Sequence, residues 1–471
     1  MFACLLTKVL ILIIVYVWSL SIDNCYVFAG EDKEEVLPAI INNLKLKVEV
    51  VSDGLDNPTS MAFLGQDDIL VLEKDKGTVR RILNGNMLDK PLLQVDVAEK
   101  IKGRLGEMGM LGIAVSKNSF NADAHVFLYY TEAKSEDGTD PVSNRLYKYQ
   151  LVNNKLKDSE LLLNLLGSPP TMTANDNNND NGDNNNNKDH DDENSGQMSG
   201  LGANHNGGAV VIGPDNNLYL VIGDVGGHKT RDQNVKGGSS AKATSSILKV
   251  SQDGKPTDNK GILGDEDPLN KYYAYGIRNS FGMDFDPVTG NLWNTENGPD
   301  YGDEINLVEP GFNSGWLVVQ GIWKPNLEKL SPNGYTRGEV LLNPSYDLES
   351  FAGKGKYSNP EFIWKETVGP TALKFFSSDK YGKEYQNDIF VGDLNNGYLY
   401  RFELNENRTG LALNGSLTDE VADNSNEINE EGIIFGKGFG GITDIEVGPD
   451  GLLYVVSIGY GKIFKIIPTH E

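Results

Sequence analysis

Histidines are the first candidates for catalysis, because the chain of 471 residues has only five. His205 lies in the glycine-flanked stretch 202–208 (GANHNGG), which predicts a turn leading into a strand. Such a turn can present the imidazole to a cavity. Because the pKa of histidine lies near neutral pH, His205 is a candidate general base, and His228 is a weaker one. Taken alone, either histidine is more often structural than catalytic.

Arg278 and Asn279 form a second candidate group, within the stretch 275–282 (YGIRNSFG). The guanidinium of an arginine presents a planar fork of donors, which suits a carboxylate or a quinone oxygen. An alternative is that Arg278 simply forms an ion pair with Asp303 between two structural elements.

Oxygen ligands gather in the stretch 295–306 (TENGPDYGDEIN). A turn at Gly298 and Pro299 would expose its carbonyls close to Asp303 and Glu304, and hard oxygen ligands of this kind suit Ca²⁺. The sequence therefore predicts a calcium site here. The alternative is an acidic turn that is only solvated.

The elements that must position these residues are short strands separated by Gly, Asp and Asn turns. This pattern recurs six times, beginning at residues 61, 110, 208, 282, 371 and 442. Strands that repeat with the same turn signal are typical of radial β architectures. We therefore expect an all-β fold, a six-bladed β-propeller with four-stranded blades over residues 45–468, whose functional residues lie at one mouth of the central channel. A pair of β-sandwiches is the alternative.

The composition narrows the class of partner. Lys and Arg number 42 against 67 Asp and Glu, so the formal net charge is −25 at pH 7. Nucleic acid is excluded as an expected partner, because binding to phosphates needs clustered cations. The 53 glycines agree with many tight turns.

The N-terminus has the features of a targeting segment. Lys8 precedes an apolar run over residues 9–18, and small residues at 28–30 are followed by charges. This order predicts a signal peptide over residues 1–30, followed by a linker over 31–44, and a secreted or cell-surface protein. An uncleaved anchor that tethers the chain to a membrane is the alternative. Cys4 and Cys25 both lie in this segment, so the mature chain would have no thiol.

One segment fits no blade. Residues 173–195 are nearly all Asn and Asp, and we expect a disordered insertion there because such a composition cannot offset its ordering entropy. Asn177, Asn179 and Asn181 have the spacing of a calcium loop. Lys188, however, stands where that loop needs a bidentate Glu, which argues against the calcium alternative.

Taken together, these stretches resemble the soluble quinoprotein glucose and aldose dehydrogenases, the glucose/sorbosone dehydrogenase family, from about residue 55 to residue 467. The resemblance is carried by GEMGMLG (106–112), NHNGG (204–208), IGDVG (222–226), GIRN (276–279), ENGP (296–299), GDEIN (302–306) and NSGW (313–316). It implies a six-bladed propeller that binds pyrroloquinoline quinone (PQQ) and Ca²⁺ at the channel mouth.

The resemblance also implies roles for single residues. His205 would take the proton of the anomeric hydroxyl while hydride passes to the quinone, and Asp224 would orient the histidine. Arg278 would polarise the quinone oxygens. The implied cofactor-binding residues are Glu107, His205, Arg278, Asn279, Asn297, Asn395 and Thr443, and the implied metal ligands are the carbonyls of Gly298 and Pro299, beside Asp303 and Glu304.

Two departures from the family pattern concern the cofactor's carboxylates. The family binds them with a Lys in the fifth blade's loop and a pair of Arg before the last blade. Asn395 stands at the Lys position here, and no Arg lies near Thr443. Lys229, Arg231 or Lys374 are candidates to replace these cations.

Two classes of function follow. The first is a PQQ- and Ca²⁺-dependent aldose dehydrogenase that forms a lactone and passes electrons to an external acceptor. The second is a non-redox propeller, either a carbohydrate- or protein-binding module or a calcium-dependent hydrolase.

Overall fold

The computed structural model describes residues 39–98, 100–101, 104–116, 124–134, 141–165, 204–226, 230–257, 260–331, 334–341, 344 and 347–469. The predicted signal peptide, the Asn/Asp insertion, His228 and Lys229 lie outside these residues. No helix among the described residues is long and apolar enough to cross a membrane.

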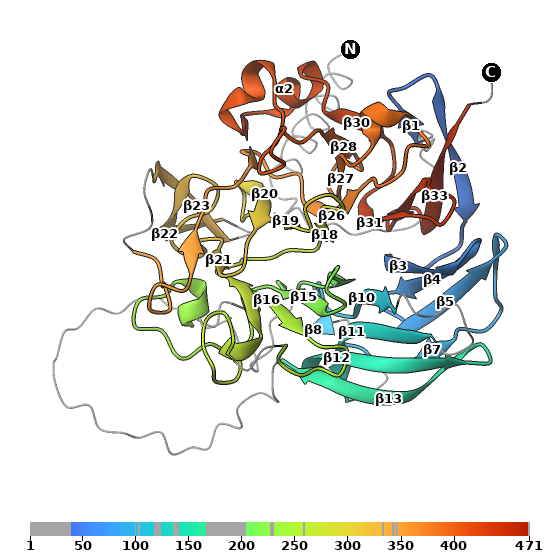
Figure 1. The fold of residues 1–471 in the computed structure, drawn as a ribbon, viewed down its shortest axis with the longest axis horizontal. Helices are drawn as coiled ribbons and strands as arrows, with labels where there is room; N and C mark the ends of the chain where they lie inside the picture. Colours follow the sequence, from blue (N-terminus) through green and yellow to red (C-terminus); the bar gives the residue numbers. More distant parts are fainter. Residues whose placement is uncertain are drawn as a thin grey trace, which may run out of the picture. The chain divides into compact units, whose positions relative to one another are not determined.

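The strands assemble into sheets of four to six strands, ordered along the chain (Figure 1). The first sheet holds β3 (Pro58–Gly65), β4 (Asp68–Glu73), β5 (Thr78–Leu83), β6 (Asn86–Met87) and β7 (Leu93–Gln94). The second holds β10 (Met110–Val115), β11 (His125–Ala133), β12 (Pro141–Val152) and β13 (Lys155–Asn164). The third holds β14 (Val210–Ile212), β15 (Leu218–Ile222), β16 (Ser246–Val250), β17 (Tyr272–Tyr275), β21 (Phe312–Asn313) and β24 (Lys356–Tyr357).

The second half of the chain continues in the same way. The fourth sheet holds β18 (Met283–Phe285), β19 (Leu292–Glu296), β20 (Asp303–Val308), β25 (Phe362–Trp364) and β29 (Val421–Ala422). The fifth holds β26 (Pro370–Phe375), β27 (Ile389–Asp393), β28 (Leu399–Phe402), β30 (Ile434–Lys437) and β1 (Ile40–Ile41). The sixth holds β31 (Ile442–Val447), β32 (Leu453–Ser457), β33 (Lys462–Pro468) and β2 (Leu46–Ser52). Smaller elements are the hairpins β22 (Trp323–Ser331) with β23 (Gly334–Val340) and β8 (Lys100–Ile101) with β9 (Arg104–Leu105), and the helix α2 (Ser425–Glu430).

The first strands of these sheets contact one another in turn: β3 with β10, β10 with β14, β14 with β18, β18 with β26, and β26 with β31. Strand β31 contacts β3 again, so the sheets close on themselves within residues 39–471. A cluster of buried apolar side chains fills the space between each pair of neighbouring sheets. The prediction of an all-β propeller is therefore confirmed.

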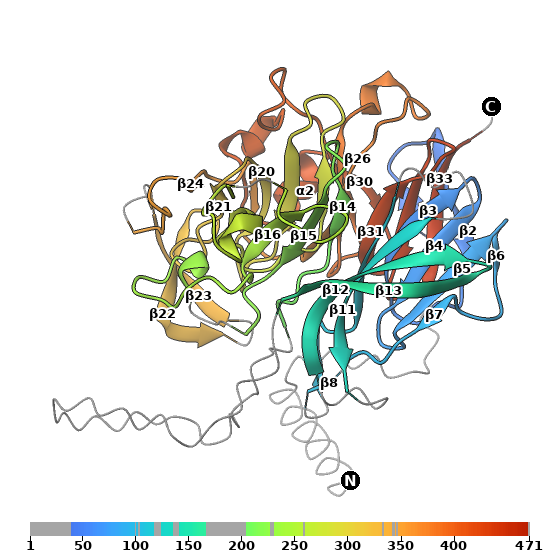
Figure 2. The same ribbon diagram turned by 60° about the horizontal axis from the view of Figure 1, so that its bottom comes forward.

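The ring is closed by the N-terminal strand β2, which pairs antiparallel with β33, so the two ends of the folded part share one sheet (Figures 1 and 2). Strand β1 also pairs with β30, and the N–H of Asn42 donates to the carbonyl of Phe435 at 2.8 Å. Two predictions are corrected by these contacts. Residues 39–44 are part of the fold rather than a linker, and the sheets have four to six strands rather than four throughout.

Second strands such as β15 and β32 are buried over their whole length. They face neighbouring sheets on both sides, so their sequences (LYLVI and LYVVS) are continuous apolar runs rather than alternating ones. These buried second strands position the loops that follow them.

Candidate functional site

Topology brings the candidate residues to one edge of the sheets. In an antiparallel sheet, the residues before the first strand and those after the second lie at the same end. Glu107, His205, Arg278 and Asn279 precede first strands, whereas Lys74, Asp224, Asn297 and Asn395 follow second strands. The segments are far apart in sequence, but their loops meet at this end.

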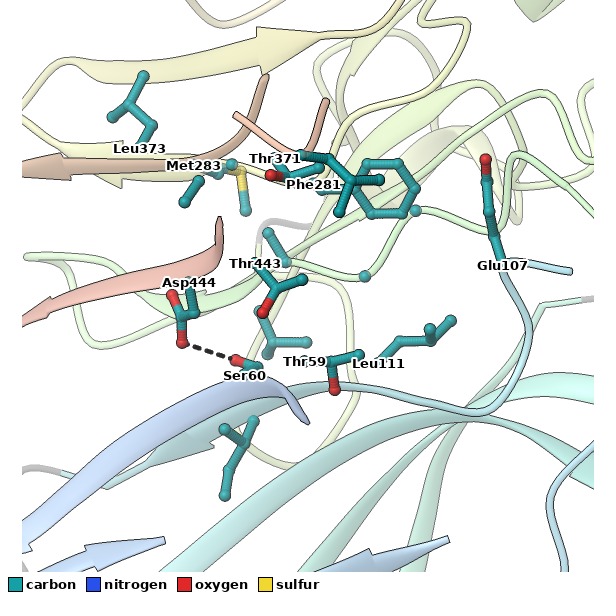
Figure 3. Close-up of a pocket in the computed structure, with 18 of the residues that line it drawn as sticks. Thr59, Ser60, Glu107, Leu111, Phe281, Met283, Thr371, Leu373, Thr443 and Asp444 are labelled. Carbon is teal, nitrogen blue, oxygen red and sulfur yellow. Dashed lines mark hydrogen bonds between the residues drawn. The ribbon is translucent and has the colours of Figure 1, made fainter. Parts of the chain in front are cut away.

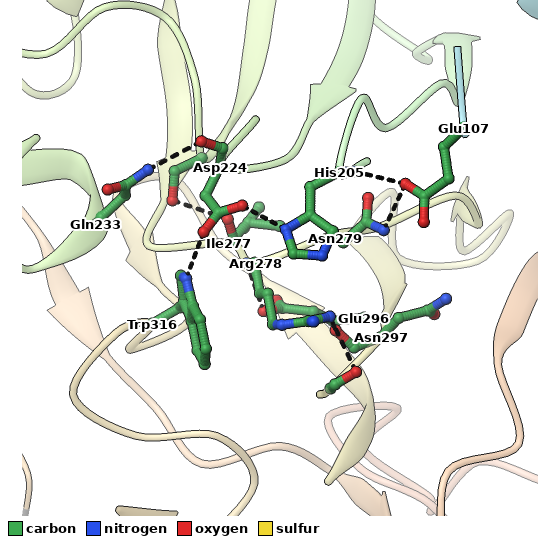
Figure 4. Close-up of polar contacts among 12 residues, drawn as sticks. Glu107, His205, Asp224, Gln233, Ile277, Arg278, Asn279, Glu296, Asn297 and Trp316 are labelled. Atoms are coloured by element: carbon green, nitrogen blue, oxygen red, sulfur yellow. Dashed lines mark hydrogen bonds and ion pairs between the residues drawn. The ribbon is translucent and has the colours of Figure 1, made fainter. Parts of the chain in front are cut away.

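His205 and Asp224 form the centre of the site. The Nδ1 atom of His205 lies 2.5 Å from Oδ1 of Asp224, and the two residues come from the segments before β14 and after β15 (Figure 4). With Asp224 ionised, Nδ1 carries the proton and Nε2 is left as the basic nitrogen. The imidazole is 21% exposed, so a ligand can reach it. His205 also has a φ of 62°, in the left-handed region that is uncommon for a residue other than glycine and that often marks functional sites.

Asp224 is buried and held on both carboxylate oxygens. Its Oδ2 accepts a hydrogen bond of 2.8 Å from Nε1 of Trp316. Burial by itself raises the pKa of a carboxyl, but the nearby His205, Arg278 and Trp316 outweigh it, so the pKa of Asp224 is lowered. Asp224 is therefore an anion suited to orient His205 and to stabilise its protonated form.

Glu107 connects the histidine to the neighbouring loop. Its Oε2 accepts the backbone N–H of His205 at 2.6 Å and the side-chain amide of Asn279 at 3.0 Å. The carboxylate thus bridges the segments before β10, β14 and β18 (Figure 4).

Arg278 is buried beside this pair. Its guanidinium donates to the carbonyls of Asn297 and Gly298 at 2.8 and 2.9 Å, and it lies 5.4 Å from the ring centre of Trp316. Its backbone N–H donates to Glu296 at 2.8 Å. Burial lowers the pKa of Arg278, although Asp224, Glu107, Asp303 and Glu296 oppose this effect. The attraction of Asp303 acts on Arg278 in addition to these carbonyl contacts, so the alternative of an ion pair with Asp303 stays open.

The predicted calcium ligands Asp303 and Glu304 are corrected by the structure. They do not lie in an exposed turn, because they open the buried strand β20. Asp303 accepts the backbone N–H groups of Gly298, Val368 and Gly369 at 2.7–2.8 Å. Glu304 accepts from Gln320, Asn306 and the backbone of Gly321. Both carboxylates therefore hold loops together.

The other two predicted calcium ligands are the backbone carbonyls of Gly298 and Pro299. The carbonyl of Gly298 is engaged by the Arg278 guanidinium, and Pro299 is buried. Within the described ranges, no group of three His, Cys, Asp or Glu side chains has a geometry that could hold a metal ion. That absence concerns side chains only, so a calcium site built on the carbonyls of Gly298 and Pro299 stays a prediction.

The side chains of Asn395 and Thr443 hydrogen-bond to backbone carbonyls. The amide of Asn395 donates to the carbonyl of Thr367 at 3.4 Å, and the hydroxyl of Thr443 donates to the carbonyl of Pro58 at 2.9 Å. Arg231 is exposed on a short 3-10 helix after Asp224. Lys374 is committed to Glu446 and Asp284, at 2.9 and 3.5 Å, so it is not available as a replacement cation.

A cavity of about 190 Å³ lies along the inner strands (Figure 3). Residues of all six first strands line it, among them Thr59, Ile113, Val210, Met283, Thr371 and Thr443. Glu107 and Asn297 also line it, and both contact the catalytic candidates. The cavity therefore borders the residues that contact His205 and Arg278.

Three residues of this region had no role in the sequence prediction. Trp316 and Glu296 lie within the motifs NSGW and ENGP, so their place in these motifs is the signal that could have marked them. Lys74 lines the cavity and lies outside every motif, so no pattern in the sequence points to it.

Comparison with known proteins adds an independent line of evidence. The sequence model of a family described as glucose/sorbosone dehydrogenase matches residues 55–178 and 181–465. The chain is 24% identical to the aldose sugar dehydrogenase YliI of Escherichia coli (strain K12), over 92% of this chain and 94% of that protein. It is 23% identical to the quinoprotein glucose dehydrogenase B of Acinetobacter calcoaceticus, over 76% and 77% of the two chains. The PQQ-bound aldose sugar dehydrogenase of Streptomyces coelicolor has the same fold, with a TM-score of 0.56 and 20% identity over 90% of this chain and 99% of the other.

Proposed function

Because the chain belongs to the glucose/sorbosone dehydrogenase family, we propose that it is a sugar dehydrogenase that oxidises the C1 hydroxyl of an aldose to a lactone, with PQQ as its cofactor. The observation that carries the proposal is the contact of 2.5 Å between His205 Nδ1 and the buried Asp224. A partly exposed imidazole that a fixed carboxylate orients is a general base at a ligand-accessible position.

His205 acts on the proton of the C1 hydroxyl. Its Nε2 accepts this proton, and Asp224 stabilises the resulting imidazolium. Glu107 and Asn279 hold the segment that carries the histidine. PQQ, when bound, would supply the two-electron oxidant for the hydride of C1, so that one proton and one hydride would leave each sugar. Regeneration of the cofactor then requires an external electron acceptor.

The site residues fit an anionic quinone in two respects. The Arg278 guanidinium is a buried donor group next to the cavity, suited to quinone or carboxylate oxygens. The side-chain Oδ1 of Asn297, which lines the cavity, is buried without a hydrogen-bond partner among the described residues. A buried polar atom of this kind calls for a ligand that satisfies it. Arg278 and Asn297 would hold the cofactor.

Further features belong to the same proposal. We take the six sheets of four or more strands as six blades, supported by the closed order of contacts between their first strands. The segment 1–30 directs the protein out of the cytoplasm, where it is secreted or tethered. The hydrolase alternative is not supported, because Asp444 and Glu446, which line the cavity, are bonded to the backbone N–H of Met61 and to Lys374.

A titration tests the function. The purified mature chain is titrated with PQQ, with and without Ca²⁺, while cofactor absorbance is followed, and dye reduction is then measured with a panel of aldoses. We expect saturable binding and sugar-dependent reduction. The His205→Ala variant should bind PQQ but turn over about 10²- to 10⁴-fold more slowly.

His125→Ala is the matched control, because His125 is exposed at the start of β11 and outside the site. It should behave as the wild type does. Absence of saturable PQQ binding by the wild type would favour the non-redox binding module instead.

A further inference from the structure

Lys74 lies at the same end of the sheets as the candidate site. It directly follows the second strand β4, the position that Asp224 and Asn297 occupy near the ends of β15 and β19. It lines the cavity together with Glu107, Asp444 and Glu446. Of the described residues that line this cavity, Lys74 alone is cationic.

The backbone of Lys74 is fixed on both sides. Its N–H donates to the carbonyl of Asn57 at 3.1 Å, and its carbonyl accepts the N–H of Met110 at 2.9 Å. The side-chain stem passes close to Gly109, where a Cβ atom would come within 2.9 Å of the Lys74 Cγ. Gly109 also has a φ of 120°. A glycine is therefore required beside the lysine, in the loop that carries Glu107.

The ammonium group is held in place but retains donors. Lys74 Nζ lies 2.5 Å from Oδ1 of Asp75, and the other oxygen of Asp75 accepts from Asn57 at 2.7 Å. The Lys74 side chain is only 13% exposed. Since an ammonium has three N–H donors and the Asp75 bond uses one, two remain for a ligand.

A ligand carboxylate in this cavity requires a cation, because three carboxylates already line it and the chain carries a charge of −25. The positions where the family places cations hold the neutral Asn395 and Thr443, whose side chains contact backbone carbonyls. Lys374 is committed to two carboxylates. Among the residues that line the cavity, Lys74 is therefore the cation that can bind such a carboxylate.

We propose that Lys74 is a carboxylate-binding residue of the cavity and that it binds a carboxylate of the quinone cofactor. The proposal rests on the proposed function. An acidic sugar could bring the same chemical group, so the experiment separates the two sources.

The test compares wild type, Lys74→Met and Lys74→Arg by fluorescence titration with PQQ and with its trimethyl ester, which has no charged carboxylate. We expect Lys74→Met to weaken PQQ binding about 10- to 100-fold, the loss of a charge-assisted hydrogen bond, while leaving the affinity for the ester unchanged. Lys74→Arg should recover most of the PQQ affinity. The affinity of Lys74→Met for PQQ should also depend less on salt than that of the wild type.

Lys76→Met is the matched control. Lys76 lies two residues farther along, is 54% exposed and pairs with Asp56, so its loss should leave PQQ binding unchanged. Thermal unfolding of each variant confirms that it is folded. If Lys74→Met does not fold, Lys74→Gln takes its place in the same titrations, and a PQQ affinity of Lys74→Gln equal to that of the wild type overturns the proposal.

The outcomes are distinct. Equal PQQ affinity of wild type and Lys74→Met overturns the proposal while the proposed function stands. Equal PQQ affinity combined with a raised KM for glucuronate, but not for glucose, assigns Lys74 to an acidic sugar and overturns the cofactor assignment. A wild type that binds neither PQQ nor its ester overturns both.

Discussion

The indole of Trp316 donates a hydrogen bond of 2.8 Å to the carboxylate of Asp224, on the oxygen opposite to the one that contacts His205. The same ring lies 5.4 Å from the guanidinium carbon of Arg278. One buried aromatic side chain therefore fixes the anion that orients the base and packs against the cation of the site. The orientation of His205 depends on a residue 111 positions away in the sequence.

Replacement of this indole donor should lower both the stability of the protein and its kcat, while an aromatic ring still fills the same space. Trp316→Phe keeps an aromatic ring but leaves a buried carboxylate oxygen without its donor. We expect the free energy of unfolding to fall by about 1.5–3 kcal/mol, because the lost bond is made to a charged group. The kcat for sugar oxidation should fall as well, while PQQ affinity changes little. Denaturant unfolding and steady-state kinetics measure the two effects.

Trp323→Phe provides the comparison, because Trp323 is also buried and packs against Tyr301. It should lose stability through packing alone and keep its kcat. An unchanged kcat in Trp316→Phe would show that Asp224 does not need the indole.

The carboxylate of Asp303 should matter for folding rather than for metal binding. Asp303→Ala leaves the backbone N–H groups of Gly298, Val368 and Gly369 without their acceptor. Because each buried N–H without a partner costs about 1–3 kcal/mol, the free energy of unfolding should fall by roughly 3 kcal/mol or more. When PQQ is absent, neither the addition of Ca²⁺ nor the addition of EDTA should shift the melting temperature of the wild type or of the variant.

The exposed Asp300 lies in the same segment, and Asp300→Ala should cost far less stability. A calcium-dependent rise in the melting temperature of the wild type that Asp303→Ala abolishes would restore Asp303 as a metal ligand.

Stability should fall as the pH rises toward neutrality, in part because of Asp232. Burial raises the pKa of Asp232 to about 7, although the hydroxyl of Tyr272 donates to it at 2.6 Å. The folded state thus keeps the proton longer than the unfolded state. The contribution of Asp232 is fully present below its unfolded pKa near 3.8 and is lost as the pH rises through about 7.

Denaturant unfolding from pH 4 to pH 8 measures this dependence. Asp232→Asn should flatten the fall in stability between about pH 4 and 7, by as much as 1.4 kcal/mol for each pH unit. Asp89→Asn, at an exposed position after β6, should leave the profile unchanged. A profile of Asp232→Asn that superimposes on that of the wild type contradicts the prediction.

The fold could be predicted from the sequence because its elements are local. An apolar run and a Gly or Asp turn mark most strands, and a first strand lies at each of the six predicted starting positions, namely β3, β10, β14, β18, β26 and β31. The closing strand β2 was not predicted. Its partner β33 lies more than 400 residues farther along the chain, and no local pattern specifies a pairing of that kind.

The candidate site likewise contains residues whose proximity could be predicted from the sequence and residues whose contacts could not. His205, Asp224, Arg278, Asn279 and Glu107 were predicted and lie together, since each belongs to a loop at the same end of a strand. Asp303 and Glu304 were assigned wrongly. Their sequence shows only two acidic residues after a glycine, whereas the donors that occupy Asp303 include Val368 and Gly369 from a distant loop.

The sequence by itself determined the class of fold, the end of the sheets at which the site lies and the residue types available there, because these depend on periodicity and on turn chemistry. Only the tertiary structure decided how these groups are used. It placed Trp316 on Asp224, Arg278 on two carbonyls and Lys74 at the cavity. The charge and hydrogen bonding of a buried group depend on all of its neighbours, and in a closed ring of sheets those neighbours come from every part of the chain.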